Sequence, residues 1–418
     1  MSSRPASRSA RTDPAGRLRA KLVRSLHESG WLRSDRVAQA LAAVPREAFV
    51  RDIAESRGLQ AVYANEALPA KVDGRGRWVS SSSQPSVMTM MLELLDPRAG
   101  ERVLEVGGGT GYNAALLCEL VGSKGRVTTI EIDRRLAGRA RGALRESGHR
   151  ARVVVGDGRL GFPLGAPYDR IIVTASAAEV PNAWIEQLRP GGRIVVPLRL
   201  GTEVVPQVIP AFERSGAGLR SVGMTWGGFM DLHDGSAALP AIPQQLNASY
   251  VGAGSGKQLV RVTGPAVERL SSKAQRRLLS LVLDGPRDRE AQGSLTTRFP
   301  SPPAVLLWLL ERLPPARRVE LHADARIAVG LASRGGAAAV ASFRDRPFGR
   351  CDPLPPHDHA ARERWWLEVY GDGAPVAELV RLIDEWRSLP TQDSGFQIHV
   401  RRSQREHARI QLGWQRSE

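Results

Sequence analysis

The feature that most constrains this chain is a glycine-rich loop, Glu105-Val106-Gly107-Gly108-Gly109-Thr110-Gly111. The apolar run Arg102–Val106 predicts a strand before the glycines, and Tyr112–Val121 predicts a helix after them. Glycine residues let a backbone turn sharply and approach a ligand without a clash at Cβ. A loop that follows a strand in this way lies at the carboxyl edge of an open α/β sheet, where such folds bind ligands.

Strands and helices alternate after this loop. We predict strands at Arg126–Ile132, Val153–Val155, Tyr168–Thr174 and Gly192–Pro197, and helices at Ser86–Leu95, Arg134–Ser147 and Trp184–Leu188. This alternation indicates an α/β fold in which helices cover the faces of a parallel sheet. Residues 51–80 are predicted to be a loop, because Asp73-Gly74 and Gly76 are turn signals.

The length of 418 residues suggests two or three domains. We expect a disordered tail at 1–16, because these residues are rich in Arg, Ser and Ala, and N-terminal helices at 17–97. The α/β core spans 98–235 and completes a domain at 17–235. Gly, Ser, Ala and Pro cluster at 235–243 and mark a boundary. An additional C-terminal α/β domain, mixing helices with several strands, is predicted at 244–418.

The composition excludes some classes of protein. The formal charge is +16, which attracts polyanions, but the basic residues are spread along the chain, and this does not favour a nucleic-acid partner. A biased composition with a solvated face explains the charge equally well. The two cysteines, Cys118 and Cys351, make neither a disulfide framework nor a zinc site, so we expect a reduced, cytoplasmic protein. The pair His357 and His359 has no further close ligand, and we expect no metal.

The glycine pattern and two acidic strand ends point to a nucleoside ligand. The dinucleotide fingerprint fails because Tyr112 occupies its third glycine position, whereas E-x-G-x-G-x-G is the pattern that methyltransferases use for S-adenosyl-L-methionine. Glu131 ends the second strand and can accept hydrogen bonds from ribose hydroxyls. Asp133, in contrast, fits a helix N-terminus. Asp157, beside Gly158 at the end of the third strand, can accept from the adenine amino group.

Several segments together resemble the protein-L-isoaspartate O-methyltransferase family over residues 20–200. They are Val44–Val50, Tyr63–Pro69, Ser83-Gln84-Pro85, Gly156-Asp157-Gly158, Ala166–Asp169, Val173-Thr174-Ala175, Val180-Pro181, Gln187-Leu188, Pro190-Gly191-Gly192 and Val196-Pro197-Leu198. The resemblance implies a class I S-adenosyl-L-methionine-dependent methyltransferase with a Rossmann-like doubly wound sheet. S-adenosyl-L-homocysteine would be the product of its cofactor.

The resemblance also assigns site residues. The family's substrate-contacting serine maps to Ser83, and Ser82, Gln84 and Tyr63 are expected to line the substrate site. An alternative role for Ser83 is to cap the helix after Pro85. The cofactor-binding residues are expected to be Glu105, Gly107, Gly109, Thr110, Gly111, Glu131, Asp157 and Gly158. The segment Gly74–Ser82 is longer and more polar than its family counterpart, which leaves the choice of substrate open.

The predicted activity is carboxyl O-methylation of an aspartyl or isoaspartyl residue in a peptide. A carboxylate is deprotonated at neutral pH, so the enzyme needs no general base. The ester then cyclises to a succinimide. C-terminally extended relatives modify aspartate in ribosomally synthesised peptides (lanthipeptide and graspetide tailoring), and this is the favoured role, with 244–418 recognising a precursor peptide. The alternatives are general protein L-isoaspartate repair and, from another class, an RNA or DNA methyltransferase. No membrane partner is expected.

Overall fold

The computed structural model describes most of the chain as two compact units. Its described residues are 13–74, 76, 78–199, 207–230, 232, 246–251, 257–297, 308–310, 312–323, 326–344, 361–388, 396–402 and 407–414. Unit 1 contains the described residues up to 175 together with 186–195, and unit 2 contains 176–185 and the described residues from 196 onward. The predicted tail lies mostly, and the predicted boundary at 235–243 wholly, outside the described residues, as does the pair His357 and His359.

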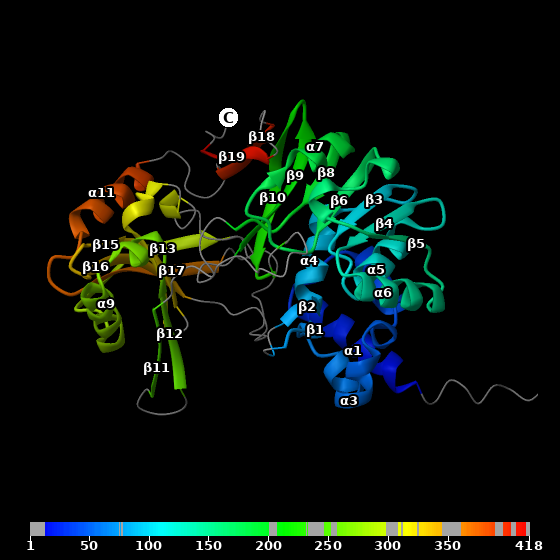
Figure 1. The fold of residues 1–418 in the computed structure, drawn as a ribbon, viewed down its shortest axis with the longest axis horizontal. Coiled ribbons are helices and arrows are strands. Elements are labelled where there is room, and N and C mark those ends of the chain that lie inside the picture. Colours follow the sequence, from blue (N-terminus) through cyan, green and yellow to red (C-terminus); the bar gives the residue numbers. More distant parts are fainter. Residues whose placement is uncertain are drawn as a thin grey trace, which may run out of the picture. The chain divides into compact units, whose positions relative to one another are not determined.

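Unit 1 is built on five parallel strands (Figure 1). Their order is β5-β4-β3-β6-β8, and their bounds are β3 Arg102–Val106, β4 Arg126–Glu131, β5 Ala151–Val155, β6 Tyr168–Val173 and β8 Leu188–Val195. The register pairs, such as Val103 with Val127 and Val106 with Val173, run in parallel. The predicted class I methyltransferase architecture is confirmed.

Helices cover this sheet through apolar contacts. Helix α4 (Pro85–Leu95) packs against β6 and β8, while α5 (Tyr112–Val121) and α6 (Arg134–Glu146) pack against β4 and β5. Leu104 and Ile171 are completely buried at the centre of the sheet. Burial of each such side chain stabilises the fold by about 1.5–3 kcal/mol, so the central strands read as nearly continuous apolar runs.

The N-terminal part corrects two predictions. Helix α1 (Pro14–Glu28) begins inside the expected tail, because Asp13 caps it and Pro14 suits its first turn. Helix α2 (Asp35–Ala43) starts after Ser34, as predicted. Residues 51–80 are not a loop.

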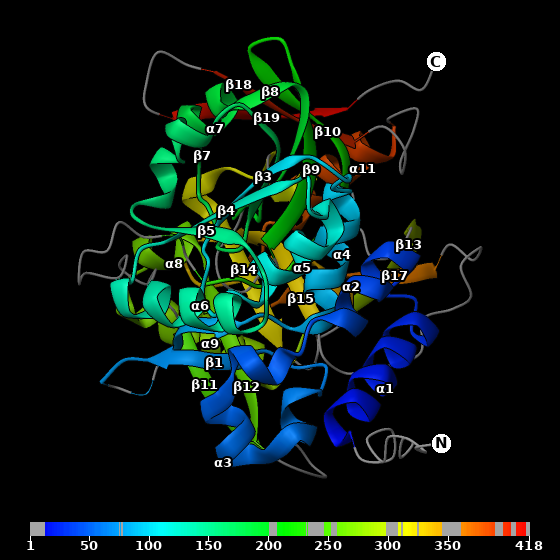
Figure 2. The ribbon, with the colours of Figure 1, turned by 90° about the vertical axis from the view of Figure 1, so that its right-hand side faces the viewer.

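Instead, α3 (Arg51–Val62) and a hairpin of β1 (Leu68–Val72) and β2 (Trp78–Ser82) occupy this stretch. Helix α3 buries few apolar residues and bends at Gly58 (φ 77°), so its sequence carries no helical periodicity. In Figure 2, α1, α3 and β1 lie below the strands β3, β4 and β5.

Unit 2 contains two antiparallel arrangements. In the first, the order is β9-β10-β18-β19-β7, with bounds β7 Val180–Pro181, β9 Gln207–Ser215, β10 Gly218–Gly227, β18 Phe396–Arg401 and β19 His407–Trp414. The C-terminal strand β18 pairs with β10, as in the pair Leu219 and Val400. Strand β10 belongs to the range predicted for the N-terminal domain, so the end of the chain returns to it.

The second arrangement is a seven-stranded sheet of order β11-β12-β14-β15-β16-β17-β13. Its strands are β11 Leu246–Val251, β12 Lys257–Thr263, β13 Asp288–Thr297, β14 Arg318–Ala323, β15 Arg326–Ala332, β16 Ala338–Arg344 and β17 Ala361–Tyr370. Helices α8 (Pro265–Arg269) and α9 (Ser272–Asp284) bury Val267 and Leu278 in a core shared with Val262, and α11 (Val376–Arg387) packs against β16. The sequence predicts one helix at Ala266–Leu283, where the structure has α8 and α9, and gives no signal for β11, β13 and β19.

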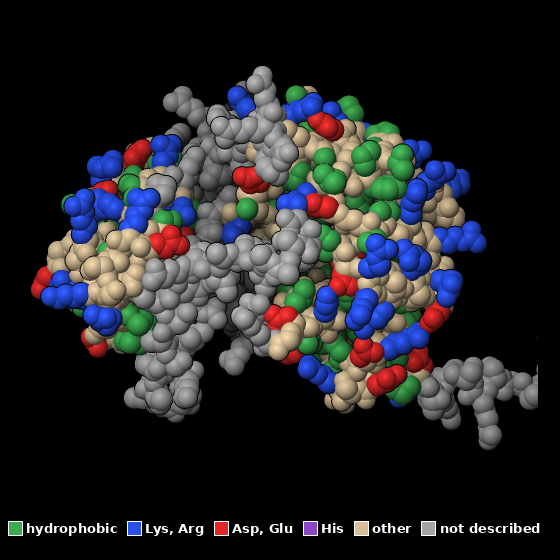
Figure 3. Space-filling model, viewed as in Figure 1, with side chains coloured by type: hydrophobic (Ala, Val, Ile, Leu, Met, Phe, Trp, Pro, Cys, Tyr) green, Lys and Arg blue, Asp and Glu red, His purple; other side chains and the backbone are tan. Residues whose placement is uncertain are grey.

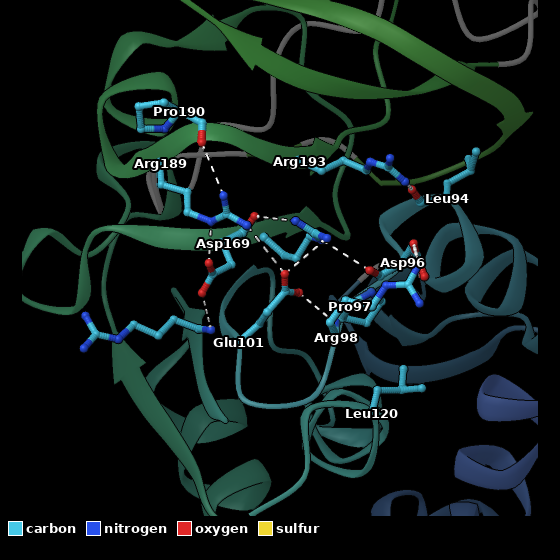
Figure 4. A network of polar contacts seen from close by, with 12 residues as sticks. Leu94, Asp96, Pro97, Arg98, Glu101, Leu120, Asp169, Arg189, Pro190 and Arg193 are labelled. Carbon is cyan, nitrogen blue, oxygen red and sulfur yellow. Dashed lines mark hydrogen bonds and ion pairs between the residues drawn. The ribbon is translucent and has the colours of Figure 1, made fainter. Parts of the chain in front are cut away.

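The amino ends of the parallel strands are tied together by ion pairs (Figure 4). Glu101 contacts Arg170 at 3.2 Å, and both side chains are about nine-tenths buried, with relative exposures of 12% and 11%. The same carboxylate accepts from the Arg98 amide at 2.7 Å, and Asp169 accepts from the Arg102 amide at 2.8 Å. Charged residues therefore close the edge opposite to the glycine loop. No helix of the described residues has the length and apolar character needed to cross a membrane.

We predict that Glu101→Ala lowers the free energy of unfolding by about 3 kcal/mol, because it leaves the buried Arg170 guanidinium without its carboxylate. Urea denaturation measures this loss. The control is Glu146→Ala, which removes an exposed pair with Arg51 and should change stability by less than about 1 kcal/mol. Equal losses in both variants would contradict the role assigned to this network.

Candidate active site

The glycine loop has the backbone geometry that its sequence requires. Gly107, Gly109 and Gly111 have φ of 97°, 50° and 86°, a region that side chains disfavour. A Cβ on Gly107 would lie 2.6 Å from Thr174 Oγ1. The Thr174 hydroxyl donates to the Val106 carbonyl at 3.0 Å, and the Gly107 amide donates to the Ile130 carbonyl at 2.9 Å. The loop is therefore compact and glycine-rich, with Thr110 as its one side chain between Gly107 and Gly111, at the carboxyl ends of β3 and β4.

Glu131 and Asp133 end β4 and have different roles. Glu131 Oε2 accepts from the Gly109 amide at 2.7 Å, and Oε1 accepts from the Asp133 amide at 2.9 Å, so its buried carboxylate ties β4 to the loop. Each oxygen has a second lone pair for a ligand hydroxyl. Asp133 caps α6, as predicted, by accepting from the Arg135 and Leu136 amides.

Asp157 lies after β5 and before the short 3₁₀ turn η3 (Gly158–Leu160). Its Oδ2 pairs with Arg159 Nη2 at 2.7 Å, and its Oδ1 accepts from the Arg159 amide at 2.9 Å. The carboxylate thus stands at the predicted strand end, next to the buried Gly158, and Arg159 holds its orientation. The strand ends of β3, β4 and β5 bring Thr110, Glu131 and Asp157 to one edge of the sheet.

Glu105 lies one residue before the end of β3 and is completely buried. Asn113 donates to its Oε1 at 2.8 Å. Burial raises the pKa of Glu105 to about 7, and the charge of Glu131 acts in the same direction, whereas hydrogen bonding by Thr129 and Asn113 acts against it. Glu105 therefore links the end of β3 to the start of α5 beneath the glycine loop.

The buried guanidinium of Arg46 organises the substrate side. Its Nη1 donates to the carbonyl of Val62 at 3.0 Å, and its Nη2 donates to the carbonyls of Glu66 at 3.2 Å and Ser83 at 2.9 Å. Arg46 is completely buried, and this desolvation lowers its pKa to about 10. One cation therefore joins the end of α3 to the segment that precedes α4.

Two of the four residues predicted for the substrate site, Ser82 and Ser83, contact this cation. Ser82 is buried and contributes its carbonyl and hydroxyl oxygens to Arg46, at 3.4 and 3.5 Å. Ser83 is half-buried, and Gln84 is the N-cap residue of α4. The alternative that Ser83 caps this helix is wrong, because the Asn65 side chain accepts from the Ser86 amide at 2.9 Å instead.

Tyr63 lies behind these serines. Its hydroxyl donates to Glu47 Oε2, and burial raises its pKa well above the ordinary value. Its ring is buried, with 6% exposure. The structure therefore places Tyr63 in the support of the site, with its hydroxyl already committed to Glu47.

The hairpin brings the serine segment to the glycine loop. A Cβ added to Gly109 would lie 3.5 Å from the Ser81 carbonyl oxygen and 3.7 Å from Ser80 Oγ. Strand β2 therefore passes close to the loop; Ser82 ends the strand, and Ser83 follows it in the segment before α4. The serine segment and the glycine loop thus meet at Ser80, Ser81 and Gly109.

Sequence reasoning assigned no role to Arg46 or Asn65. A signal for Arg46 was available, since a single arginine lies between Val44 and Phe49, both buried. Asn65 offered none, because its partner Ser86 is separated from it by the hairpin.

The five-stranded sheet and the glycine loop define a class I S-adenosyl-L-methionine-dependent methyltransferase. Residues 17–225 match the family model of protein-L-isoaspartate(D-aspartate) O-methyltransferase. The protein-L-isoaspartate O-methyltransferase of Methanopyrus kandleri is 46% identical over 184 residues, which span 44% of this chain and 77% of that protein. That of Pyrobaculum islandicum is 38% identical over 216 residues, or 51% of this chain and 98% of that protein.

A solved structure of a protein-L-isoaspartate O-methyltransferase aligns with 94% of this chain and 99% of its own, at 25% identity and a TM-score of 0.50. The chain belongs to the protein-L-isoaspartate(D-aspartate) O-methyltransferase family. It is an S-adenosyl-L-methionine-dependent enzyme of the protein carboxyl O-methyltransferase type.

We predict that Arg46→Met lowers the free energy of unfolding by about 3–5 kcal/mol, because several buried carbonyl groups lose their donor together. Arg51→Met, which removes a half-exposed arginine, should change stability by less than about 1 kcal/mol. Urea denaturation of both variants gives the comparison. A small effect at Arg46 would show that the carbonyls find other donors.

A pH dependence follows from Glu105. Its pKa in the folded state is about 7, compared with 4.5 for an unperturbed glutamate, so the folded ligand-free protein binds the proton more tightly than the unfolded chain. The contribution of Glu105 to stability is therefore fully present below pH 4.5 and falls by about 3 kcal/mol as the pH rises through 7. Urea unfolding at pH 5 and 8 should show this fall in the wild type and in the exposed control Glu28→Gln. It should disappear in Glu105→Gln.

Proposed function

We propose that the chain methylates the free carboxylate of L-isoaspartyl residues in damaged polypeptides, as a repair enzyme. The observation that carries this proposal is the passage of β2 over the glycine loop, with Ser80 and Ser81 beside Gly109. This arrangement places the serine segment beside the glycine loop. The family resemblance assigns substrate binding to the serine segment and cofactor binding to the loop. The substrates of the family are peptide carboxylates, and the activity follows from that membership.

The cofactor residues fit S-adenosyl-L-methionine. The glycines of the loop admit close approach of a ligand, and Glu131 offers second lone pairs to the ribose. Asp157, which Arg159 orients, is the proposed acceptor for the adenine amino group. When bound, the cofactor supplies an electrophilic methyl group on a sulfonium sulfur.

The residues of the chain need only position the acceptor. The substrate carboxylate, with a pKa of about 4, is already ionised at neutral pH and requires no base. The Ser83 hydroxyl donates a hydrogen bond that orients one oxygen of the substrate carboxylate. Arg46 holds the Ser83 backbone by donating to its carbonyl. Positioning of this kind supplies on the order of 7–11 kcal/mol. The resulting methyl ester is then attacked by the neighbouring backbone nitrogen, methanol leaves, and a succinimide forms.

The comparisons support repair more closely than peptide tailoring. The sequence favours tailoring because the chain extends beyond the methyltransferase domain, and repair requires no such C-terminal extension. A solved structure named protein-L-isoaspartate O-methyltransferase aligns with 94% of this chain. A C-terminal extension of this size therefore does not distinguish the two roles. That residues 244–418 recognise the substrate stays a prediction.

A nucleic-acid substrate has less support. In Figure 3 the described Lys and Arg side chains are interspersed with Asp and Glu on the visible face. Interspersed charges produce a weaker field for a polyanion than a single basic stripe does.

We expect the purified enzyme to transfer one methyl group to an isoaspartyl peptide and none to the same peptide with ordinary aspartate, as measured by mass spectrometry. Ser83→Ala should lower kcat by roughly tenfold to a hundredfold, because a hydrogen bond to a charged group is lost, while affinity for S-adenosyl-L-homocysteine is unchanged. Glu131→Gln should weaken that affinity.

Ser56→Ala, on the exposed side of α3, is the matched control and should leave both quantities unchanged. Methylation of the ordinary aspartyl peptide alone would favour tailoring and overturn the repair role. Equal loss of cofactor affinity in Ser83→Ala and Glu131→Gln would overturn the assignment of the site.

A further inference from the structure

Two large apolar side chains are exposed at the outer end of the β1–β2 hairpin. Val72 has 52% relative exposure and Trp78 has 47%. They are direct cross-strand partners in the hairpin register. The register shifts between Lys71 and Val72, and this irregularity places the two apolar residues opposite each other at the turn end of the hairpin, where we treat them as one apolar surface. Single exposed apolar residues are common, but a paired valine and tryptophan beside a candidate active site is less so.

The inner part of the hairpin is anchored, so this surface is held in a defined place. Lys71 Nζ forms an ion pair with Asp133 Oδ2 at 2.5 Å, and Arg139 Nη2 donates to the Ala70 carbonyl at 2.8 Å. Both contacts fasten β1 to the start and middle of α6. On the other strand, Arg46 holds Ser82. Along the hairpin, the anchored residues Ala70, Lys71 and Ser82 precede the last pair before the turn, Val72 and Trp78.

The apolar surface is continuous with the candidate active site along β2. Trp78 begins the strand, Ser80 and Ser81 pass over Gly109, and Ser83 follows. At about 3.3 Å per residue, Trp78 lies roughly 17 Å from Ser83 along the strand. An extended polypeptide covers that length with about five residues.

We propose that Val72 and Trp78 form a docking surface for an apolar side chain of the substrate polypeptide, about five residues from the methylated residue. The inference rests on the proposed function and on the course of β2, which runs from Trp78 to the serines beside Gly109. Burying an apolar side chain against the tryptophan ring strengthens binding without touching the reacting atoms. The pair therefore affects KM and leaves kcat unchanged.

The experiment compares two isoaspartyl peptides in the full-length enzyme. They differ only at the fifth residue on each side of the isoaspartate, which is leucine in one peptide and serine in the other. The wild type should show a KM that is roughly threefold to tenfold lower for the leucine peptide. Trp78→Ala should abolish this preference at unchanged kcat and unchanged affinity for S-adenosyl-L-homocysteine. Trp78→Phe should retain most of it.

The matched control is Val222→Ala, an apolar residue with 40% exposure on β10, which should keep the full preference. A wild type that methylates both peptides with the same KM overturns the docking surface alone. A Trp78→Ala variant that keeps the preference, or that loses kcat or cofactor affinity as well, also overturns it. A change in oligomeric mass on substitution would identify the surface as a contact between copies of the chain. A wild type that methylates neither peptide overturns the proposed function itself.

Discussion

The substrate side of this protein depends on one buried cation without an acidic partner. Arg46 stabilises its charge with carbonyl dipoles from the end of α3 and from the serine segment before α4. A buried charge is costly unless its donors are satisfied, so these carbonyls must stay close to the guanidinium. The positions of Ser82 and Ser83 are consequently coupled to the folding of the N-terminal helices. This coupling explains why the segment before the parallel sheet belongs to the catalytic unit.

The cofactor side uses backbone geometry more than side chains. Three glycines with positive φ allow β3 to turn directly into α5, and hydrogen bonds from neighbouring strands hold the turn. Charged residues are concentrated at the opposite edge of the sheet, where Glu101, Arg170 and Asp169 close the amino ends. The two edges of one sheet therefore serve separate purposes: one edge is cross-linked for stability, and the other is left with polar groups available for a ligand.

The sequence was most informative where local signals and tertiary contacts agree. Strand β3, helix α5 and the Asp133 cap could be predicted because apolar periodicity and capping chemistry act over a few residues. Helix α3 could not, since packing around Ile53 and Val62 forms it without a periodic pattern. Strands β11 and β13 lie at the edges of their sheet, where polar residues are tolerated and β-propensity is weak. Partners distant in sequence, such as Asn65 and Ser86, require the fold itself.

The bond between Glu131 and the Gly109 amide has a consequence for recognition. The carboxylate that is expected to receive the ribose is already the brace that sets the curvature of the loop. A ligand entering this edge meets a surface whose torsion angles need no rearrangement, so little conformational entropy is lost on binding. The loop is thus preorganised for the nucleoside before any ligand arrives.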